Sequence, residues 1–217
     1  MEDEVKYYYD SHQTEKDRMG EPSNHSELVR YLWKVLEWLF QVQTCTIYKN
    51  LNFYQTRNPQ EYPLAPDIAV IKGVTPQHLR SWKVGLTGLA PQVVFEIASE
   101  ETWKNDLQEK PFKYATMGVK EYFFYDPGDS AYWRRTKRRL IGWQLDQTTG
   151  TVIEMVPDQQ GRLWSQQFES FLVPDDMYLR LYDSNNQRRL TEAEALAQQN
   201  KALIQKLRSL GVNPDAL

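Results

Sequence analysis

Two acidic residues interrupt short apolar segments in the middle of the chain. Asp67 lies in the segment 65–71, Ala-Pro-Asp-Ile-Ala-Val-Ile, and Glu96 lies in the segment 91–99, Pro-Gln-Val-Val-Phe-Glu-Ile-Ala-Ser. A carboxylate inside a buried strand is costly unless a cation meets it, so two such acids in successive strands predict a shared positive partner. A divalent metal ion is the simplest such partner, and Mg²⁺ prefers oxygen ligands and retains several waters.

A predicted helix follows these strands and carries a row of charged and aromatic side chains. We expect the helix over residues 105–118, with Gly118 just past its C-terminal end. The side chains spaced to share one of its faces are Asp106, Lys110, Lys113 and Tyr114. A lysine there would orient a metal-bound water or neutralise charge on a phosphoryl oxygen. The two acids and one of these lysines therefore suit the hydrolysis of phosphodiester bonds.

Each of these residues also has a purely structural explanation. Asp67 suits a turn after Pro66, Glu96 a structural salt bridge, Asp106 the first turn of a helix, and Lys110 a solvated surface. The joint pattern favours a site, because both acids interrupt apolar strands from which charge is otherwise excluded. Histidine chemistry has little support, since His12, His25 and His78 are scattered, and the chain has no glycine-rich phosphate loop or GxSxG motif.

The composition indicates a globular protein with no overall basic character. The chain has 217 residues, enough for one domain and an appendage, with 41% hydrophobic residues, 13% aromatic residues and a formal net charge of −3. Its single cysteine, Cys45, excludes an intrachain disulfide and a cysteine-built zinc site. No segment approaches the roughly 18 consecutive apolar residues of a membrane span, and the acidic N-terminus lacks the layout of a signal peptide. We therefore expect a cytoplasmic protein without a membrane partner.

With this net charge, nucleic acid would have to bind through a local basic patch. The one run of cations consists of Arg134, Arg135, Lys137, Arg138 and Arg139. It is either a patch that contacts phosphates or the solvated tip of a hairpin, and the sequence favours neither.

The predicted elements bring the two acids to one edge of a sheet. We expect a helix from about Ser23 or Asn24 to Phe40, then strands at 44–48, 51–54, 65–71, 91–99 and 121–126. Residues 72–90 are expected to be a long irregular connection that rims the site. A strand, the helix at 105–118 and a further strand predict a right-handed crossover. Antiparallel strands at 140–145, 151–156 and 163–168 would extend the sheet, and residues 174–189 would be a polar connection.

Two helical features leave alternatives open. Glu27, near the start of the first helix, either interacts with the helix dipole or points toward the metal. Residues 190–210 form a separate predicted helix whose a and d heptad positions are Ala193, Leu196, Asn200, Leu203, Leu207 and Leu210. Asn at one a position is typical of a coiled-coil dimer contact. The alternative is that this helix packs on its own domain.

The motifs, taken together, resemble a known family. They are Pro66-Asp67, the string from Val93 to Ser99, Asp106 with Lys110 and Tyr114, the string from Gly118 to Tyr122, and Asp126-Pro127. They resemble the Uma-two family of bacterial endonucleases, which have the PD-(D/E)XK restriction-endonuclease fold. The resemblance covers roughly residues 22–180. It implies an α/β fold in which helices flank a mixed sheet, with additional antiparallel strands and a C-terminal helix. The expected organisation is an extension at 1–21, an endonuclease-like domain at 22–180, and a helical tail at 181–217 that dimerises.

The same resemblance implies roles for individual residues. Asp67 and Glu96 would hold Mg²⁺ or Mn²⁺, and Glu27 matches the position of a further acid on the first helix. The superfamily places a lysine two residues after the glutamate, where this chain has Ala98. Lys110 on the following helix matches the displaced lysine best, and Lys113 is the substitute. The residues with supporting roles would be Glu27, Ser99, Asp106, Lys113 and Tyr114.

The leading hypothesis is thus a Mg²⁺-dependent DNA endonuclease acting as a homodimer. A rival hypothesis is a catalytically inactive, dimeric nucleic-acid-binding or interaction module on the same fold, which Ala98 and the net negative charge favour. A third is a phosphoesterase that acts on small molecules.

Overall fold

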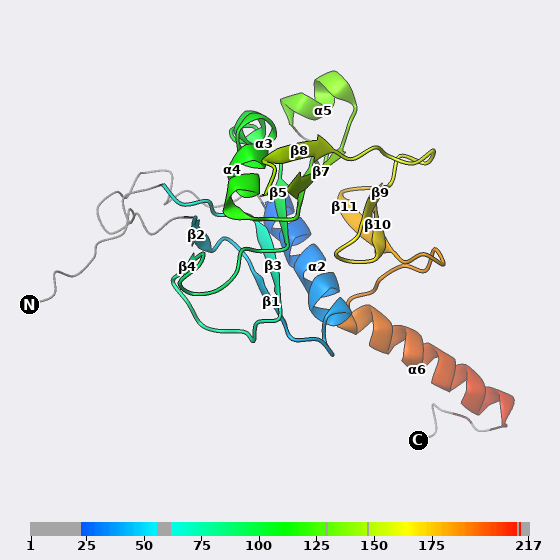
Figure 1. Cartoon of the computed structure of the whole chain (residues 1–217). Coiled ribbons are helices and arrows are strands. Elements are labelled where there is room, and N and C mark those ends of the chain that lie inside the picture. The colour runs from blue at the N-terminus through cyan, green and yellow to red at the C-terminus, as the bar shows by residue number, and fades with distance from the viewer. Residues whose placement is uncertain (1–22, 56–61, 129, 147, 212, 214–217) are drawn as a thin grey trace, which may run out of the picture.

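A six-stranded mixed β-sheet with helices on both faces forms the centre of the molecule (Figure 1). The computed structural model describes residues 23–55, 62–128, 130–146, 148–211 and 213, so the extension expected at 1–21 lies outside the described residues. The strand order is β1-β3-β5-β6-β7-β8. The bounds are β1 Cys45–Tyr48, β3 Ile68–Lys72, β5 Val93–Ile97, β6 Glu121–Tyr125, β7 Leu140–Asp146 and β8 Thr151–Glu154. The predicted mixed α/β architecture is confirmed.

The predicted strand–helix–strand unit joins the two parallel strands of this sheet. β5 and β6 pair in parallel, and every other neighbouring pair is antiparallel. The expectation of one helix over 105–118 is wrong, because two short helices, α3 (Trp103–Gln108) and α4 (Lys110–Met117), meet at Glu109. Pro111 explains the break, since it has no N–H to donate to the carbonyl of Leu107. Gly118 ends α4 with φ of 100°, a left-handed conformation that favours glycine.

The two faces of the sheet carry separate hydrophobic cores, because side chains alternate along each strand. Helix α2 (Ser23–Leu39) packs Leu28, Leu32 and Leu36 against one face, together with strand residues such as Val70 and Phe95. On the other face α4 packs Tyr114 and Ala115 with strand residues such as Ala69, Val94 and Phe124.

Two smaller sheets contain segments for which the sequence predicted a different structure. The segment 163–168 does not extend the central sheet, because β9 (Leu163–Ser165) joins β10 (Ser170–Asp175) and β11 (Tyr178–Tyr182) in a separate antiparallel sheet. The expected polar connection 174–189 therefore contains a strand. Its Leu179 and Leu181 are fully buried in the α2 core, and their burial outweighs the polar residues around them. The expected irregular connection 72–90 also contains a strand, β4 (Ser81–Lys83), which pairs in parallel with β2 (Asn52–Tyr54) around buried Trp82.

The C-terminal helix α6 (Glu192–Ser209) projects away from the body of the molecule (Figure 1). It begins at a capping box in which the Thr191 hydroxyl accepts from the N–H of Glu194 and the Glu194 carboxylate accepts from the N–H of Thr191. No residue of α6 is buried, and the side chains of Leu196, Leu203 and Leu210 are 48%, 52% and 70% exposed. Its first residue, Glu192, lies close to α2, so the start of α6 contacts the domain and most of the remaining helix is exposed.

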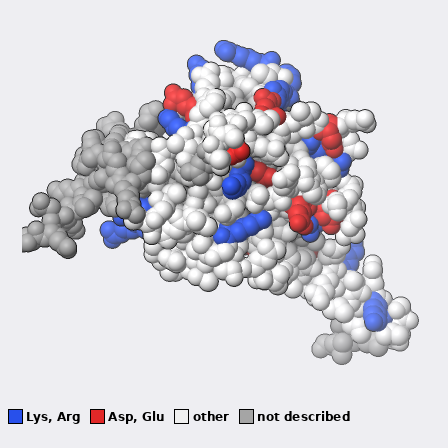
Figure 2. Space-filling model, viewed as in Figure 1, with Lys and Arg blue, Asp and Glu red and all other residues white. Residues whose placement is uncertain are grey.

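The surface charges are mixed. On the face seen in Figure 2, Lys and Arg side chains alternate with Asp and Glu side chains over a largely uncharged surface. Neither sign forms a continuous stripe there, in keeping with the small net charge. No helix in the described part of the chain combines the length and apolarity that a membrane span requires.

Candidate active site

The two acids singled out in the sequence meet where β3 begins and β5 ends. Asp67 directly precedes β3, and Glu96 is the penultimate residue of β5. The antiparallel register pairs Ile68 with Phe95, so the next position along places Asp67 beside Glu96. The Asp67 carboxylate accepts a hydrogen bond of 2.6 Å from the backbone N–H of Ile97. Both acids are buried, with 9% and 4% of their surface exposed.

Lys110 bridges two buried carboxylates. Its Nζ lies 2.7 Å from Oε1 of Glu96 and 2.8 Å from Oδ1 of Asp106. Asp106 is fully buried on α3, and Lys110 is the first residue of α4, so the break at Glu109 still leaves them at i, i+4 distance. Lys110, at the start of α4, thus supplies the positive charge at Glu96 that the alanine at position 98 cannot supply.

Three ring side chains hold the acidic cluster, which we define as Asp67, Glu96, Asp106 and Lys110. The Tyr114 hydroxyl donates to Oε1 of Glu96 at 2.5 Å, and the Tyr122 hydroxyl donates to the backbone carbonyl of Asp106 at 2.7 Å. His25, from the start of α2, places Nε2 3.4 Å from Oδ2 of Asp67. The sequence analysis did not predict a role for Tyr122 or His25. The sequence signal for Tyr122 is its place in the apolar strand that follows the helix, whereas no local pattern connects His25 with Asp67.

The electrostatics of the cluster reflect a shortage of positive charge. Burial raises the pKa of Glu96 to about 8; Lys110 opposes the shift, while Asp106 and Asp67 add to it. Burial likewise raises the pKa of Asp106 above its usual value, against the effect of Lys110. Burial alone would lower the pKa of Lys110, but the carboxylates of Glu96 and Asp106 raise it above its usual range. Two carboxylates thus share a single ammonium group, and the Asp67 carboxylate adds a third negative charge close to Glu96.

The residues present suit a hard divalent cation in their chemistry. Among the described residues, no group of three or more His, Cys, Asp or Glu side chains is placed to hold a metal ion. Two carboxylates completed by waters are nevertheless a common way to bind Mg²⁺. The buried Oδ2 of Asp106 also has no hydrogen-bond partner among the described residues. An ion with two positive charges held by Asp67 and Glu96 would offset the excess of negative charge in the cluster.

Three of the predicted supporting residues contact other groups. Glu27 is exposed, and its carboxylate accepts a 2.6 Å hydrogen bond from Tyr178. Lys113 is exposed and lies 2.8 Å from Glu109. The Ser99 hydroxyl accepts from the N–H of Thr102 at 3.2 Å, which stabilises the turn before α3. Of the supporting set, Asp106 belongs to the acidic cluster and Tyr114 contacts it through Glu96.

The basic run lies in the connection between the antiparallel strands β6 and β7, where Arg134 and Arg135 end the short helix α5 (Ala131–Thr136) and Lys137, Arg138 and Arg139 follow it. Arg134 pairs with Glu100, and Arg138 pairs with Glu154. Arg139 serves the fold, since its guanidinium donates to the carbonyl groups of Asp126 and Pro127 and to the Tyr125 hydroxyl. Arg135 and Lys137 are the exposed members of the run that have no ion-pair partner among the described residues.

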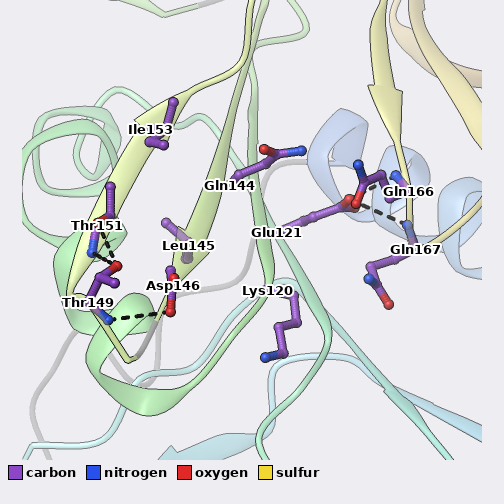
Figure 3. Close-up of a pocket in the computed structure, with 10 residues that line it drawn as sticks. All are labelled: Lys120, Glu121, Gln144, Leu145, Asp146, Thr149, Thr151, Ile153, Gln166 and Gln167. Atoms are coloured by element: carbon purple, nitrogen blue, oxygen red, sulfur yellow. Dashed lines mark hydrogen bonds between the residues drawn. The ribbon is translucent and has the colours of Figure 1, made fainter.

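A further buried acid, Glu121, lies at the opposite end of the sheet. It borders a hollow of about 600 Å³ whose lining also includes Lys120, Gln144 and Asp146 (Figure 3). The Glu121 carboxylate accepts from the Ser165 hydroxyl and from the N–H of Gln166. These hydrogen bonds satisfy the buried charge and tie β6 to the segment after β9, which explains Glu121 as a structural acid.

Comparison with known proteins defines first the class and then the family. A crystal structure from Anabaena variabilis ATCC 29413, described as "a putative nuclease belonging to DUF820", aligns with 73% of this chain and 82% of its own, with a TM-score of 0.51. At 13% identity, this likeness shows a shared fold. A family model, Uma2, described as "Putative restriction endonuclease", matches residues 1–199. The chain belongs to this Uma2 (Uma-two) family, so the resemblance expected from its motifs is confirmed. No curated protein matches the chain.

Proposed function

We propose that this chain is a Mg²⁺-dependent endonuclease that hydrolyses phosphodiester bonds in DNA. The observation that carries the proposal is the buried cluster in which Glu96 and Asp106 share the single ammonium of Lys110 while the Asp67 carboxylate lies beside Glu96. A structural salt bridge would need one acid for this lysine, whereas a metal-dependent hydrolase needs the additional carboxylates. The Uma2 membership and the nuclease-like fold support a nuclease.

Each residue of the cluster has a part in this proposal. Asp67 and Glu96 would hold Mg²⁺, or Mn²⁺ in its place. The ion would supply an acidified water and stabilise the charge that develops on the phosphoryl group. Lys110 contributes a fixed positive charge at Glu96, and Asp106 holds its ammonium there. The Tyr114 hydroxyl fixes the orientation of the Glu96 carboxylate.

Calorimetric titration with Mg²⁺ and Mn²⁺, with and without a short DNA duplex, tests this proposal. We expect the wild type to bind the metal and Asp67→Asn to lose binding by at least about tenfold, since removing a charged ligand weakens coordination more than removing an outer-shell partner does. Glu109→Gln is the matched control, because it removes an exposed carboxylate near the cluster. A wild type that binds neither ion, even with DNA present, would overturn the proposal.

A second candidate function is a catalytically inactive DNA-binding module on the same fold. The observation that favours it is that the Lys110 ammonium already occupies the space between Glu96 and Asp106. This alternative predicts DNA binding that depends on salt, with no cleavage in the presence of either metal. A cleavage assay with purified protein therefore separates the two functions.

We further propose that α6 forms a homodimer contact. Its leucines at positions 196, 203 and 210 are exposed along a helix that leaves the body of the molecule. Light scattering should give twice the mass of one chain for the wild type, and one chain for Leu196→Glu/Leu203→Glu, because charges in an apolar seam oppose association. Gln198→Glu, a charge elsewhere on α6, should leave the dimer intact. A monomeric wild type at all concentrations would contradict this contact.

A further inference from the structure

A basic hollow lies at the edge of the sheet next to the acidic cluster. It has a volume of about 390 Å³ and is lined by Tyr48, Lys49, Leu51, Gln77, His78, Leu79 and Arg80. The lining contains two permanent cations and a histidine, and it contains no acidic residue. We call it the Lys49–Arg80 hollow.

Strand pairing fixes how close this hollow is to Asp67. Tyr48 of β1 pairs with Ala69 of β3, and the N–H of Asn50 donates to the carbonyl of Pro66 at 3.1 Å. Lys49, between these two contacts, therefore lies beside the first residue of β3, one position from Asp67. Neighbouring strands are about 4.8 Å apart, so the hollow begins one strand away from the backbone of Asp67.

The walls of the hollow are held by contacts within the protein. The Tyr48 hydroxyl donates to the carbonyl of Gln77 at 3.1 Å, which ties the segment before β4 to β1. The Nζ of Lys49 lies 3.9 Å from the centre of the Trp33 ring, a cation–π contact that restrains the side chain and leaves its charge unpaired. The buried side chain of Leu51 contributes apolar surface to the lining.

Within the part of the chain that the structure describes, no acidic side chain neutralises the charge of the hollow. Lys49, His78 and Arg80 are all exposed, and none forms an ion pair with another described residue. By contrast, Arg134 and Arg138 of the basic run are each paired with a glutamate. Since the acidic cluster would repel a polyanion, a substrate strand needs unpaired positive charge close by.

We propose that the Lys49–Arg80 hollow binds a phosphate of the DNA backbone adjacent to the scissile bond and so positions the strand over Asp67 and Glu96. This inference rests on the proposed nuclease function and adds to it the groups that hold the substrate. The contact is to the sugar–phosphate backbone, so it supplies affinity and position but no sequence preference.

The salt dependence of DNA binding tests this inference. Binding of a short fluorescent duplex is measured by anisotropy at increasing KCl, with Ca²⁺ in place of Mg²⁺ to avoid cleavage, for the wild type, Lys49→Gln and Arg80→Gln. Each substitution should reduce the slope of log affinity against log salt by about 0.9, because one phosphate contact releases roughly that many counterions. Lys120→Gln is the matched control, since Lys120 directly precedes β6, whose far end pairs with Glu96, and lines the separate hollow beside Glu121 (Figure 3).

The outcomes separate this inference from the proposed function. Slopes for Lys49→Gln and Arg80→Gln that equal the slope for Lys120→Gln would overturn the inference, whatever the cleavage activity. Reduced slopes in a protein that never cleaves DNA would support the hollow and contradict the nuclease. In a wild type that cleaves, both substitutions should raise KM and leave kcat within about twofold, as expected when a contact is made equally in the ground and transition states.

Discussion

Glu96→Gln is expected to abolish metal-dependent cleavage of DNA while the chain remains folded. Glutamine has the shape of glutamate, and its amide oxygen can still accept the hydrogen bond from Tyr114. The substitution removes the negative charge that would hold the metal. A metal ion contributes several kcal/mol to such reactions, and each ~1.4 kcal/mol is a factor of ten in rate. We therefore expect a loss of at least about 1000-fold.

The stability of this variant distinguishes a lost ligand from a lost fold. Lys110 keeps Asp106 as its ion-pair partner in this variant, and burial already opposes ionisation of Glu96 by raising its pKa, so a neutral amide should leave the Tm of the metal-free protein nearly unchanged. Cleavage is measured on a linear duplex with Mg²⁺ or EDTA, and Tm by circular dichroism. Glu109→Gln, which neutralises an exposed carboxylate, is the control and should retain activity. Cleavage by Glu96→Gln within tenfold of the wild-type rate would contradict the assignment of Glu96.

Lys110→Met should be the most destabilising single substitution in the cluster. Methionine fills most of the space of the lysine stem but leaves Glu96 and Asp106 buried without a cation. Removing one partner from a buried ion pair costs about 3–5 kcal/mol, a large part of the stability of an ordinary domain. Adding Mg²⁺ should recover part of this loss, because a bound cation stabilises only the folded protein.

Urea unfolding in EDTA and in excess Mg²⁺ measures both effects. The matched control is Lys113→Met on the same helix, which removes an exposed lysine paired with Glu109 and should change the unfolding free energy by less than about 1 kcal/mol. Equal losses for Lys110→Met and Lys113→Met would show that the buried pair contributes little. A loss for Lys110→Met that Mg²⁺ leaves unchanged would argue against a metal site at these acids.

The two substitutions together separate the enzyme from the inactive module. In a nuclease, Glu96→Gln removes activity and preserves stability, whereas Lys110→Met reduces both. In a binding module that uses this cluster only as a structural ion pair, both substitutions change stability alone. The comparison depends on Lys110 contacting Glu96 and Asp106 at nearly equal distances, 2.7 and 2.8 Å.

Local patterns in the sequence were sufficient to predict the strands and helices in the central part of the fold. Strands and helices have different periods, so the apolar runs around Asp67 and Glu96 and the helical spacing from Asp106 to Tyr114 were recognisable without contacts. The crossover rule then predicted the parallel pair of β5 and β6. Pro111 is a local sign of the break at Glu109, but the helical spacing of side chains continues across the break, so the sequence predicted a single helix.

Features that depend on contacts between residues far apart in the chain could not be predicted from the sequence. The strand β11 has a polar neighbourhood and forms because α2 and β10 bury its leucines. Likewise the pairing of Arg134 with Glu100 and of Arg138 with Glu154 joins segments that have no common pattern. Helix and strand propensities do not predict such pairings, since tertiary packing overrides these propensities in short segments.

The sequence by itself determined that Asp67 and Glu96 fall in successive apolar segments and that Lys110 follows them on a helix, because hydrophobicity and periodicity are local properties of the chain. Only the tertiary structure decided that Lys110 is shared between Glu96 and Asp106, that His25 lies beside Asp67, and that Lys49 and Arg80 line a hollow next to it. The physical reason is that the interaction energy of two charges depends on the distance between them in space. Packing of the sheet between its helices sets those distances, and spacing along the chain does not.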